Sequence, residues 1–207
     1  MKVGVVDYGM SNLGSVRRAL AELGCDPFVA AAPAELGGAD RIVLPGVGSF
    51  GDGMKNLAAR DWVSAIRDEV AAGKPLLGIC LGMQLLATTG TEGGERGGLD
   101  LIPGTVRRID DFGCALRIPH VGWNSVVLPP RRCPLFEGIP GGTDFYFVHS
   151  FAFDASDRGD VVAEVQYGVP LAAAVARGHV FGAQFHPEKS SRAGFRLLKN
   201  FLEFEPC

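Results

Sequence analysis

Most signatures that assign a protein to a class at once are missing from this sequence. Its five cysteines, at positions 25, 80, 114, 133 and 207, form no C-x-x-C pair and lie at no metal-ligand spacing from a histidine. We therefore expect neither a disulfide framework nor a metal site. No apolar run approaches membrane length, and the N-terminal one is too short for a signal peptide.

Clusters of basic residues are also missing. The net charge is −3, and the Lys/Arg pairs are short and scattered, so the chain has no basic surface of the kind that binds nucleic acid. Together these absences predict a soluble, cytoplasmic protein with neither a nucleic-acid nor a membrane partner.

The chain has the size and hydrophobic content of a globular protein. It has 207 residues, of which 47% are hydrophobic, and it shows no linker, so we expect one domain over 1–207. Its first half alternates between two patterns. Strands are expected at 2–7, 27–31, 41–44 and 75–79, and helices at 15–23, 52–59, 62–72 and 82–87. This alternation predicts a parallel sheet with helices on both faces.

The second half consists of short apolar segments separated by turn residues. Strands are expected at 105–109, 115–118, 125–128, 143–151, 161–167, 171–176 and 180–184, before a final helix at 190–203. These strands predict an antiparallel extension of the sheet. The expected fold class is α/β: a single three-layer domain with a mixed, mainly parallel central sheet and an antiparallel C-terminal extension.

The most informative segment is Gly78-Ile-Cys-Leu-Gly82. It lies between a predicted strand and a predicted helix, and it matches the G-x-S-x-G nucleophile elbow with Cys80 in place of serine. The two glycines avoid side-chain collisions in so tight a turn. The amide groups of the following helix favour the thiolate. Taken alone, the motif is equally compatible with a buried structural cysteine.

A cysteine nucleophile needs a base, and the segment "FHPEKS" offers one. His186 ends an apolar strand, so it reaches the same edge of the sheet as Cys80. Glu188 projects to the same side of an extended chain and can fix the imidazole tautomer. The alternative is a solvent-facing turn, but its occurrence with the elbow favours a Cys80–His186–Glu188 triad. His120 and His149 either line the site or are core histidines.

These motifs resemble a known family. The segments "GICLGMQLL" and "FHPEKS" are similar to those of the class I (triad) glutamine amidotransferases. "DYGMSNLGSVRRAL", "LPGVGSFGDGM", "PHVGWN" and "FYFVHSF" resemble the glutaminase subunits of imidazole glycerol phosphate synthases, which act in histidine biosynthesis. The match runs from the first strand to the last helix. Phe151 stands where the family usually has tyrosine, and we expect little effect.

The resemblance implies a reaction and a substrate site. Cys80 would attack the side-chain amide of glutamine, releasing ammonia and then glutamate by way of a thioester. We expect no cofactor. Glutamine would be held at its α-amino and α-carboxylate end by Gln84 and Glu92, with help from the backbone of Ser150 and Phe151. The alternatives are an exposed polar residue for Gln84 and a loop charge for Glu92.

The stretch "LPGVGSFGDG" contains a literal G-x-G-x-x-G, which is typical of a dinucleotide-binding loop. It follows the third predicted strand, whereas such a loop normally follows the first, and the next strand ends in Cys80 and not in an acidic residue. We interpret it as a second wall of the Cys80 site. Gly46 and Val47 would bring a main-chain N–H to the oxyanion, beside the N–H of Leu81.

The resemblance also implies a partner. Free ammonia would be lost in water, and the family passes it to a separate (β/α)₈-barrel cyclase subunit in a heterodimer. Asn12, Trp123, Tyr146 and Lys189 match positions at or near that interface, although Trp123 and Tyr146 could also be ordinary core residues. Three other functions remain as alternatives: a glutaminase serving another acceptor, a nucleotide-binding module, and a non-catalytic relative.

Overall fold

A nine-stranded mixed sheet runs through the computed structural model, which describes residues 1–205. In spatial order its strands are β2 (Asp26–Ala30), β1 (Lys2–Val6), β3 (Arg41–Gly46), β4 (Leu76–Cys80), β13 (Val180–Ala183), β12 (Val169–Arg177), β11 (Val161–Tyr167), β8 (His120–Val127) and β9 (Asp144–His149). The first five are parallel, and the last four continue the sheet antiparallel. The predicted α/β class with its antiparallel extension is confirmed.

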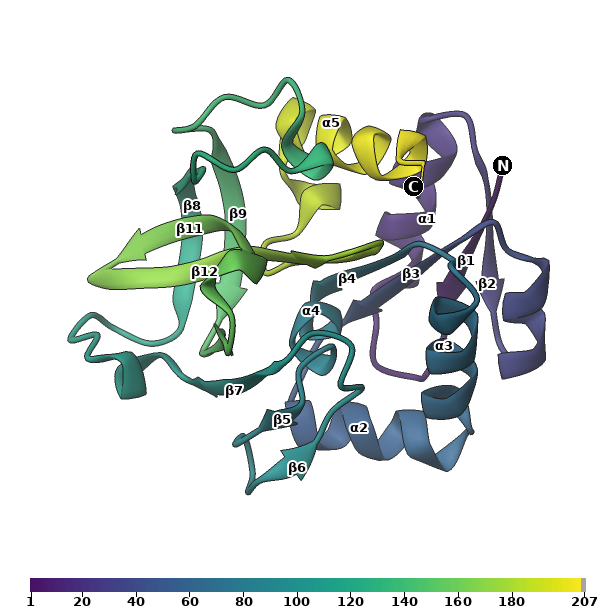
Figure 1. Cartoon of the computed structure of the whole chain (residues 1–207), viewed down its shortest axis with the longest axis horizontal. Helices are drawn as coiled ribbons and strands as arrows, with labels where there is room; N and C mark the ends of the chain where they lie inside the picture. The colour runs from purple at the N-terminus through teal and green to yellow at the C-terminus, as the bar shows by residue number, and fades with distance from the viewer. Residues whose placement is uncertain (206–207) are drawn as a thin grey trace.

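Helices cover both faces of the parallel part, as Figure 1 shows. They are α1 (Leu13–Glu22) and α5 (Ser191–Glu203) on one face, and α2 (Phe50–Ala59) and α3 (Trp62–Ala71) on the other. Along β3, Val43 joins the core under α1 and α5, whereas Ile42 and Leu44 join the core under α2 and α3. This two-sided burial explains why the parallel strands are almost continuously apolar.

The core under α5 is rich in aromatic side chains. Phe181 of β13 packs edge-on against Phe201 and Phe204, with ring centroids 6.2 and 5.0 Å apart. Such edge-to-face pairs stabilise a core beyond the area that they bury. They anchor the last helix over the strand that leads to His186. No helix within residues 1–205 is long and apolar enough to cross a membrane.

A second, four-stranded sheet lies below the main one in Figure 1. Its strands are β10 (Phe151–Ala155), β7 (Gly104–Arg108), β5 (Thr89–Gly90) and β6 (Arg96–Gly97). The expected single strand over 143–151 is wrong, because the chain leaves the main sheet at Ser150. Before that residue β9 pairs with β8, and after it β10 pairs with β7. The crossing places Ser150 between the two sheets and Phe151 at the start of β10.

The expected strand over 115–118 is also wrong, because this segment forms no strand in the structure. Its alternating pattern does not bury its apolar residues: Leu116 is 49% exposed. By contrast, β8 begins at His120, five residues before the strand that we expected at 125–128. The remaining short elements are α4 (Leu81–Leu85) and the 3₁₀ turns η1 (Pro33–Gly38), η2 (Ile109–Phe112), η3 (Pro134–Phe136), η4 (Arg158–Asp160) and η5 (Pro187–Lys189).

Candidate active site

The chain turns at Cys80 directly from β4 into α4. Cys80 has φ 55° and ψ −112°, a conformation that costs a non-glycine residue about 1–3 kcal/mol. The turn is so tight that its glycines have no room for a side chain. A Cβ on Gly82 would overlap the carbonyl oxygen of Leu44, and one on Gly78 would lie 2.6 Å from the carbonyl oxygen of Gly82. The G-x-C-x-G pattern therefore reflects a steric requirement.

His186 follows β13 and is joined to Glu188 across the η5 turn. Nδ1 of His186 lies 2.9 Å from Oε1 of Glu188, and the two side chains are only 4% and 1% exposed. Because the carboxylate accepts, Nδ1 carries the proton of this bond. The other ring nitrogen, Nε2, is buried without a hydrogen-bond partner among residues 1–205. The pair thus offers one unpaired imidazole nitrogen for chemistry.

Backbone contacts hold the imidazole in place. The amide of His186 donates to the carbonyl of Tyr146 at 3.0 Å, and the hydroxyl of Ser190 donates to the carbonyl of His186 at 2.6 Å. Burial lowers the pKa of His186, but the interactions with Cys80 and Glu188 and the negative charges of both outweigh it and raise that pKa to about 9. The imidazole is therefore protonated at neutral pH when the thiolate is present.

Cys80 and His186 open into a cavity of about 340 Å³, within the usual range of ligand pockets of roughly 300–1,000 Å³. Its lining is Val47, Gly48, Cys80, Leu81, Gln84, Glu92, Pro119, Val148, His149, Ser150, Phe151 and His186. The structure thus brings most of the predicted site residues together. Gly46 and Glu188 line a smaller, neighbouring cavity, which they share with Val47 and His186.

Gln84 lines the cavity, and a second glutamine, Gln184, is buried next to it. Gln84 is 5% exposed, so the alternative of an exposed polar residue is wrong. Its Nε2 donates to the carbonyl of Phe151 and to Oε1 of Gln184, both at 3.0 Å. Because both N–H groups are used, Oε1 of Gln84 is the atom left to accept from a ligand. Gln184 in turn directs its Nε2 at the Cys80 sulfur, 3.9 Å away.

Gln184 is a site residue that the sequence analysis missed. It precedes His186 by two residues, and residues i and i+2 of an extended chain project to the same side. That spacing, which linked His186 to Glu188, also pointed to Gln184.

Glu92 is half-buried at the rim of the cavity. Its Oε2 accepts a hydrogen bond of 2.8 Å from the amide of Phe50, the first residue of α2. A carboxylate is stabilised there by the positive end of the helix dipole. Glu92 is therefore fixed by the helix and is more than a loop charge. Its bond to Phe50 uses one carboxylate oxygen and leaves the other for a ligand.

The predicted oxyanion groups differ in their availability. Leu81 is the first residue of α4, and amides of a first helical turn have no partner within the helix. Gly46 lies directly beside Cys80 in the register of β3 and β4. The amide of Val47, however, donates to the carbonyl of Met10 at 2.9 Å. Our expectation that this N–H faces the site is therefore not met in this conformation.

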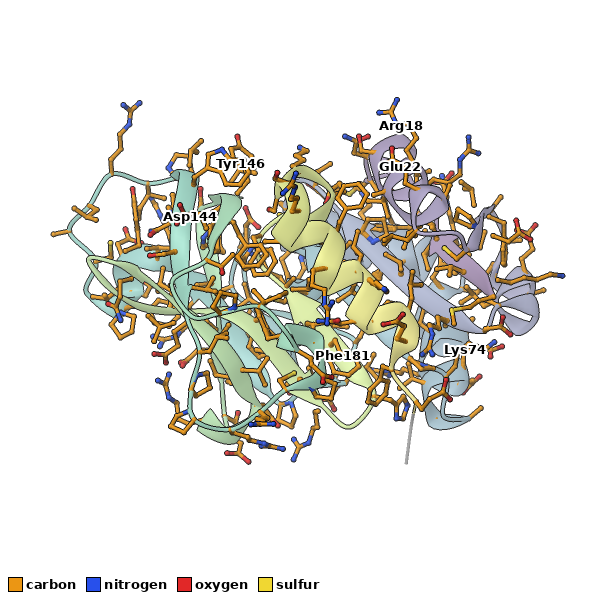
Figure 2. The ribbon with its side chains drawn as sticks, turned by 90° about the horizontal axis from the view of Figure 1, so that it is seen from above. Arg18, Glu22, Lys74, Asp144, Tyr146 and Phe181 are labelled. Atoms are coloured by element: carbon orange, nitrogen blue, oxygen red, sulfur yellow. The ribbon has the colours of Figure 1, made fainter. Side chains whose placement is uncertain are left out.

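The outward face of β8 and β9 carries an apolar surface. Trp123 and Tyr146 are cross-strand neighbours with ring centroids 6.0 Å apart, and Val121 stands opposite Val148. Trp123 is 55% exposed, so it is not a core residue, and Figure 2 shows Tyr146 at the periphery of the molecule. We call Val121, Trp123, Tyr146 and Val148 the β8–β9 patch. Asn12 and Lys189 are also exposed.

Comparisons with known proteins agree with this geometry. The family described as glutamine amidotransferase class-I matches residues 4–204. Two relatives are named imidazole glycerol phosphate synthase subunit HisH. The one from Moorella thermoacetica is 50% identical over 201 residues, covering 97% of this chain and 94% of that protein. The one from Symbiobacterium thermophilum is 50% identical over 200 residues, covering 97% and 92%.

Solved structures show the same fold. A crystal structure described as glutamine amidotransferase superposes with a TM-score of 0.75 at 25% identity, covering 97% of both chains.

The elbow predicts that Gly82 cannot be replaced. We expect Gly82→Ala to lower the free energy of unfolding by about 3 kcal/mol or more, because the methyl group must displace the Leu44 carbonyl. Gly14→Ala is the matched control. A Cβ there meets nothing within 4 Å, and alanine should stabilise α1 by up to about 1 kcal/mol. Urea unfolding curves measure both values, and equal stabilities of the two variants would contradict the steric argument.

The thiolate charge predicts a change in the titration of His186. We expect Cys80→Ala to lower the pKa of His186 below its value of about 9, because removing a negative neighbour disfavours the imidazolium. NMR titration of the imidazole measures the midpoint. Cys25→Ala is the control, since Cys25 bonds the carbonyl of Leu20 in another part of the chain. An unchanged midpoint in Cys80→Ala would show that the sulfur is not ionised beside the ring.

Proposed function

Since the chain belongs to the class-I glutamine amidotransferase family, we propose that it is the glutaminase subunit of an imidazole glycerol phosphate synthase in histidine biosynthesis. The observation that carries this proposal is the strained Cys80 elbow, which shares one cavity with the buried His186–Glu188 pair. Relatives of that name at 50% identity support the choice within the family. We further propose that 1–207 is a single amidotransferase domain, supported by the family match over residues 4–204.

In the proposed reaction, the Cys80 thiolate attacks the side-chain amide carbon of glutamine. The C–N bond of the tetrahedral intermediate breaks as the imidazolium of His186 gives its Nε2 proton to the departing ammonia, which leaves a thioester. His186, now neutral, takes a proton from water, and the hydroxide attacks the thioester to release glutamate and the thiolate. Glu188 holds Nδ1–H throughout, and Leu81 N–H stabilises the oxyanion.

The cavity offers complementary groups for the other end of the substrate. Oε1 of Gln84 and the carboxylate of Glu92 are acceptors, which suit the α-ammonium group of glutamine. The backbone of Ser150 and Phe151, where the chain crosses between sheets, would contact the α-carboxylate end. Because these contacts use only the backbone of Phe151, phenylalanine can replace the tyrosine that is usual in the family.

The bond between Val47 and Met10 suggests how the glutaminase is held at low activity. With the Val47 amide donating to Met10, the oxyanion has one donor fewer, and loss of one such donor costs about 10²–10³ in kcat. We propose that the loop at 45–51 turns this N–H into the site when the partner cyclase has bound the substrate that accepts the ammonia. Gly48, with φ +105°, supplies the backbone freedom that the turn requires.

The partner in this proposal is a (β/α)₈-barrel cyclase. It would receive ammonia through a sheltered path and use it on a ribulosyl aminoimidazole phosphate intermediate, forming imidazole glycerol phosphate and an aminoimidazole carboxamide ribotide. The β8–β9 patch offers an exposed aromatic anchor of the type that dominates binding energy at interfaces. We place Trp123, Tyr146, Asn12 and Lys189 at or near this interface.

Coupling to the acceptor provides the direct test of this function. We expect glutamate release to be slow with the chain alone and at least about 10²-fold faster with the cyclase and its nucleotide substrate, because a second oxyanion donor becomes available. A coupled glutamate dehydrogenase assay measures the rate, with Cys80→Ala as the inactive control. Full activity of the isolated chain would contradict the coupling, and undiminished turnover in Cys80→Ala would contradict the nucleophile. Stimulation by another acceptor enzyme would favour a different amidotransferase.

The loop proposal has its own observable. We expect the ¹⁵N-labelled Val47 amide resonance to shift between the resting complex and the complex with bound acceptor, because its hydrogen bond to Met10 breaks. The amide of Leu77 is the reference, since β4 is held between β3 and β13 in the sheet and lies outside the loop. A Val47 resonance that stays the same in both states would rule out the turn of this N–H.

A further inference from the structure

Two buried histidines beside the site have no part in the proposed reaction. His120 on β8 and His149 on β9 stand directly opposite each other in the strand register, on the face opposite to the β8–β9 patch. They are 2% and 6% exposed. Nδ1 of His120 lies 3.0 Å from Nε2 of His149. A polar pair this deeply buried needs an arrangement of protons that satisfies every nitrogen.

Only one neutral arrangement does so. Nδ1 of His149 lies 2.8 Å from the carbonyl oxygen of Phe151. A carbonyl can only accept, so Nδ1 of His149 carries the proton and its Nε2 is an acceptor. His120 must then donate from its Nδ1, which makes its Nε2 an acceptor as well. The side-chain amide of Asn124 faces that nitrogen at 3.4 Å and also donates to the carbonyl of Gln166 at 3.1 Å.

The surroundings keep both rings neutral. Burial lowers the pKa of His120 to about 4. Burial also lowers the pKa of His149 to about 3 and outweighs the hydrogen bond to Phe151, which raises that pKa; the neighbouring His120 and His186 lower it further. A proton added to Nε2 of His149 would face the Nδ1 proton of His120 across the 3.0 Å contact, and one added to Nε2 of His120 would face the side-chain amide of Asn124 at 3.4 Å. The three hydrogen bonds therefore run in one direction: Asn124 donates to His120, His120 to His149, and His149 to the carbonyl of Phe151. We call this chain of hydrogen bonds the relay.

The relay ends on the atom that orients the proposed substrate site. The carbonyl of Phe151 accepts from Nδ1 of His149 at 2.8 Å and from Nε2 of Gln84 at 3.0 Å. Both of its lone pairs are thereby used. The second N–H of Gln84 goes to Gln184, so the position of this carbonyl decides where Oε1 of Gln84 points.

We propose that His120 and His149 are positioning residues, which fix the Phe151 carbonyl and through it the glutamine-binding amide of Gln84. The substrate role of Gln84 rests on the proposed function, whereas the proton arrangement rests on the hydrogen bonds alone. The competing explanation is packing, because His120 stacks on Phe147 and Tyr167 with ring centroids 4.8 and 4.1 Å away. Packing requires neither a defined tautomer nor an effect on glutamine binding.

NMR of the full-length protein labelled with ¹⁵N-histidine tests the proton arrangement without any activity. We expect both rings to be neutral and protonated on Nδ1 at neutral pH, with His120→Phe and His149→Phe variants used for assignment. A proton on Nε2 of either ring, or an imidazolium, would overturn the relay. This measurement stands even if the chain proves inactive as a glutaminase, so the failure of the relay and that of the proposed function are distinguishable.

Paired amide substitutions in the complex with the cyclase test the positioning role. His149→Asn places an N–H near the position of Nδ1, whereas His149→Gln places its amide near Nε2 and removes the donor to Phe151. We expect KM for glutamine to be about tenfold higher in His149→Gln than in His149→Asn, equivalent to about 1.4 kcal/mol. The two kcat values should differ less, because the hydrogen bonds of His120 and His149 go to each other, to Asn124 and to Phe151, and not to Cys80 or His186.

Melting temperatures of the two variants establish that both are folded under the conditions of the assay. Equal KM values, or a difference confined to kcat, would assign the histidines to packing and overturn the positioning role.

Discussion

The close approach of α4 to β3 is the constraint on which the site depends. Gly82 lies so near the Leu44 carbonyl that no side chain fits between them, and this contact forces the turn that holds Cys80 at φ 55°. The strain of roughly 1–3 kcal/mol is a substantial part of a typical stability of about 5–15 kcal/mol. Two apolar cores, one on each face of the sheet, offset it. The strained turn brings three groups together at one edge of the sheet: the Cys80 sulfur, the Leu81 amide and Gly46.

The buried charges of the site depend on the same packing. Glu188 and His186 are almost fully removed from water, and such a pair is stable only when its hydrogen bonds and neighbouring charges replace hydration. The contacts to Tyr146 and Ser190 hold the His186 backbone so that the short Nδ1–Oε1 bond persists. The pKa of His186 is raised to about 9 because these partners outweigh the effect of burial. The imidazole is thus positioned and charged by groups from β4, from β9 and from the η5 turn with its C-cap Ser190.

The carbonyl of Phe151 joins the two sheets to the site. It lies immediately after the point at which the chain leaves the main sheet, and it receives hydrogen bonds from His149 and Gln84. Through Gln184 the same network reaches the Cys80 sulfur. The polar groups between the sheets therefore form one connected set, and a change at any member is felt by its neighbours. The apolar β8–β9 patch lies on the other face of the strands that carry this set.

Local pattern was sufficient for much of the fold and the site. The alternation of apolar strands and amphipathic helices determined the α/β class, and glycines around Cys80 determined the elbow, because both depend on residues close in sequence. The i, i+2 spacing likewise linked His186 to Glu188. The break at Ser150 was not predictable, since residues 143–151 have the pattern of one continuous strand. The segment at 115–118 has a strand pattern but no strand to pair with.

Only the tertiary structure decided the contacts between distant segments. Gln84 meets Gln184 a hundred residues away, and His120 meets His149 because β8 and β9 pair in one register. The direction of the Val47 amide depends on Met10, which belongs to a different loop. Hydrogen bonds of this kind follow from strand order and register, which no local pattern encodes. The sequence by itself determined which groups can do chemistry, and the fold decided which of them face one another.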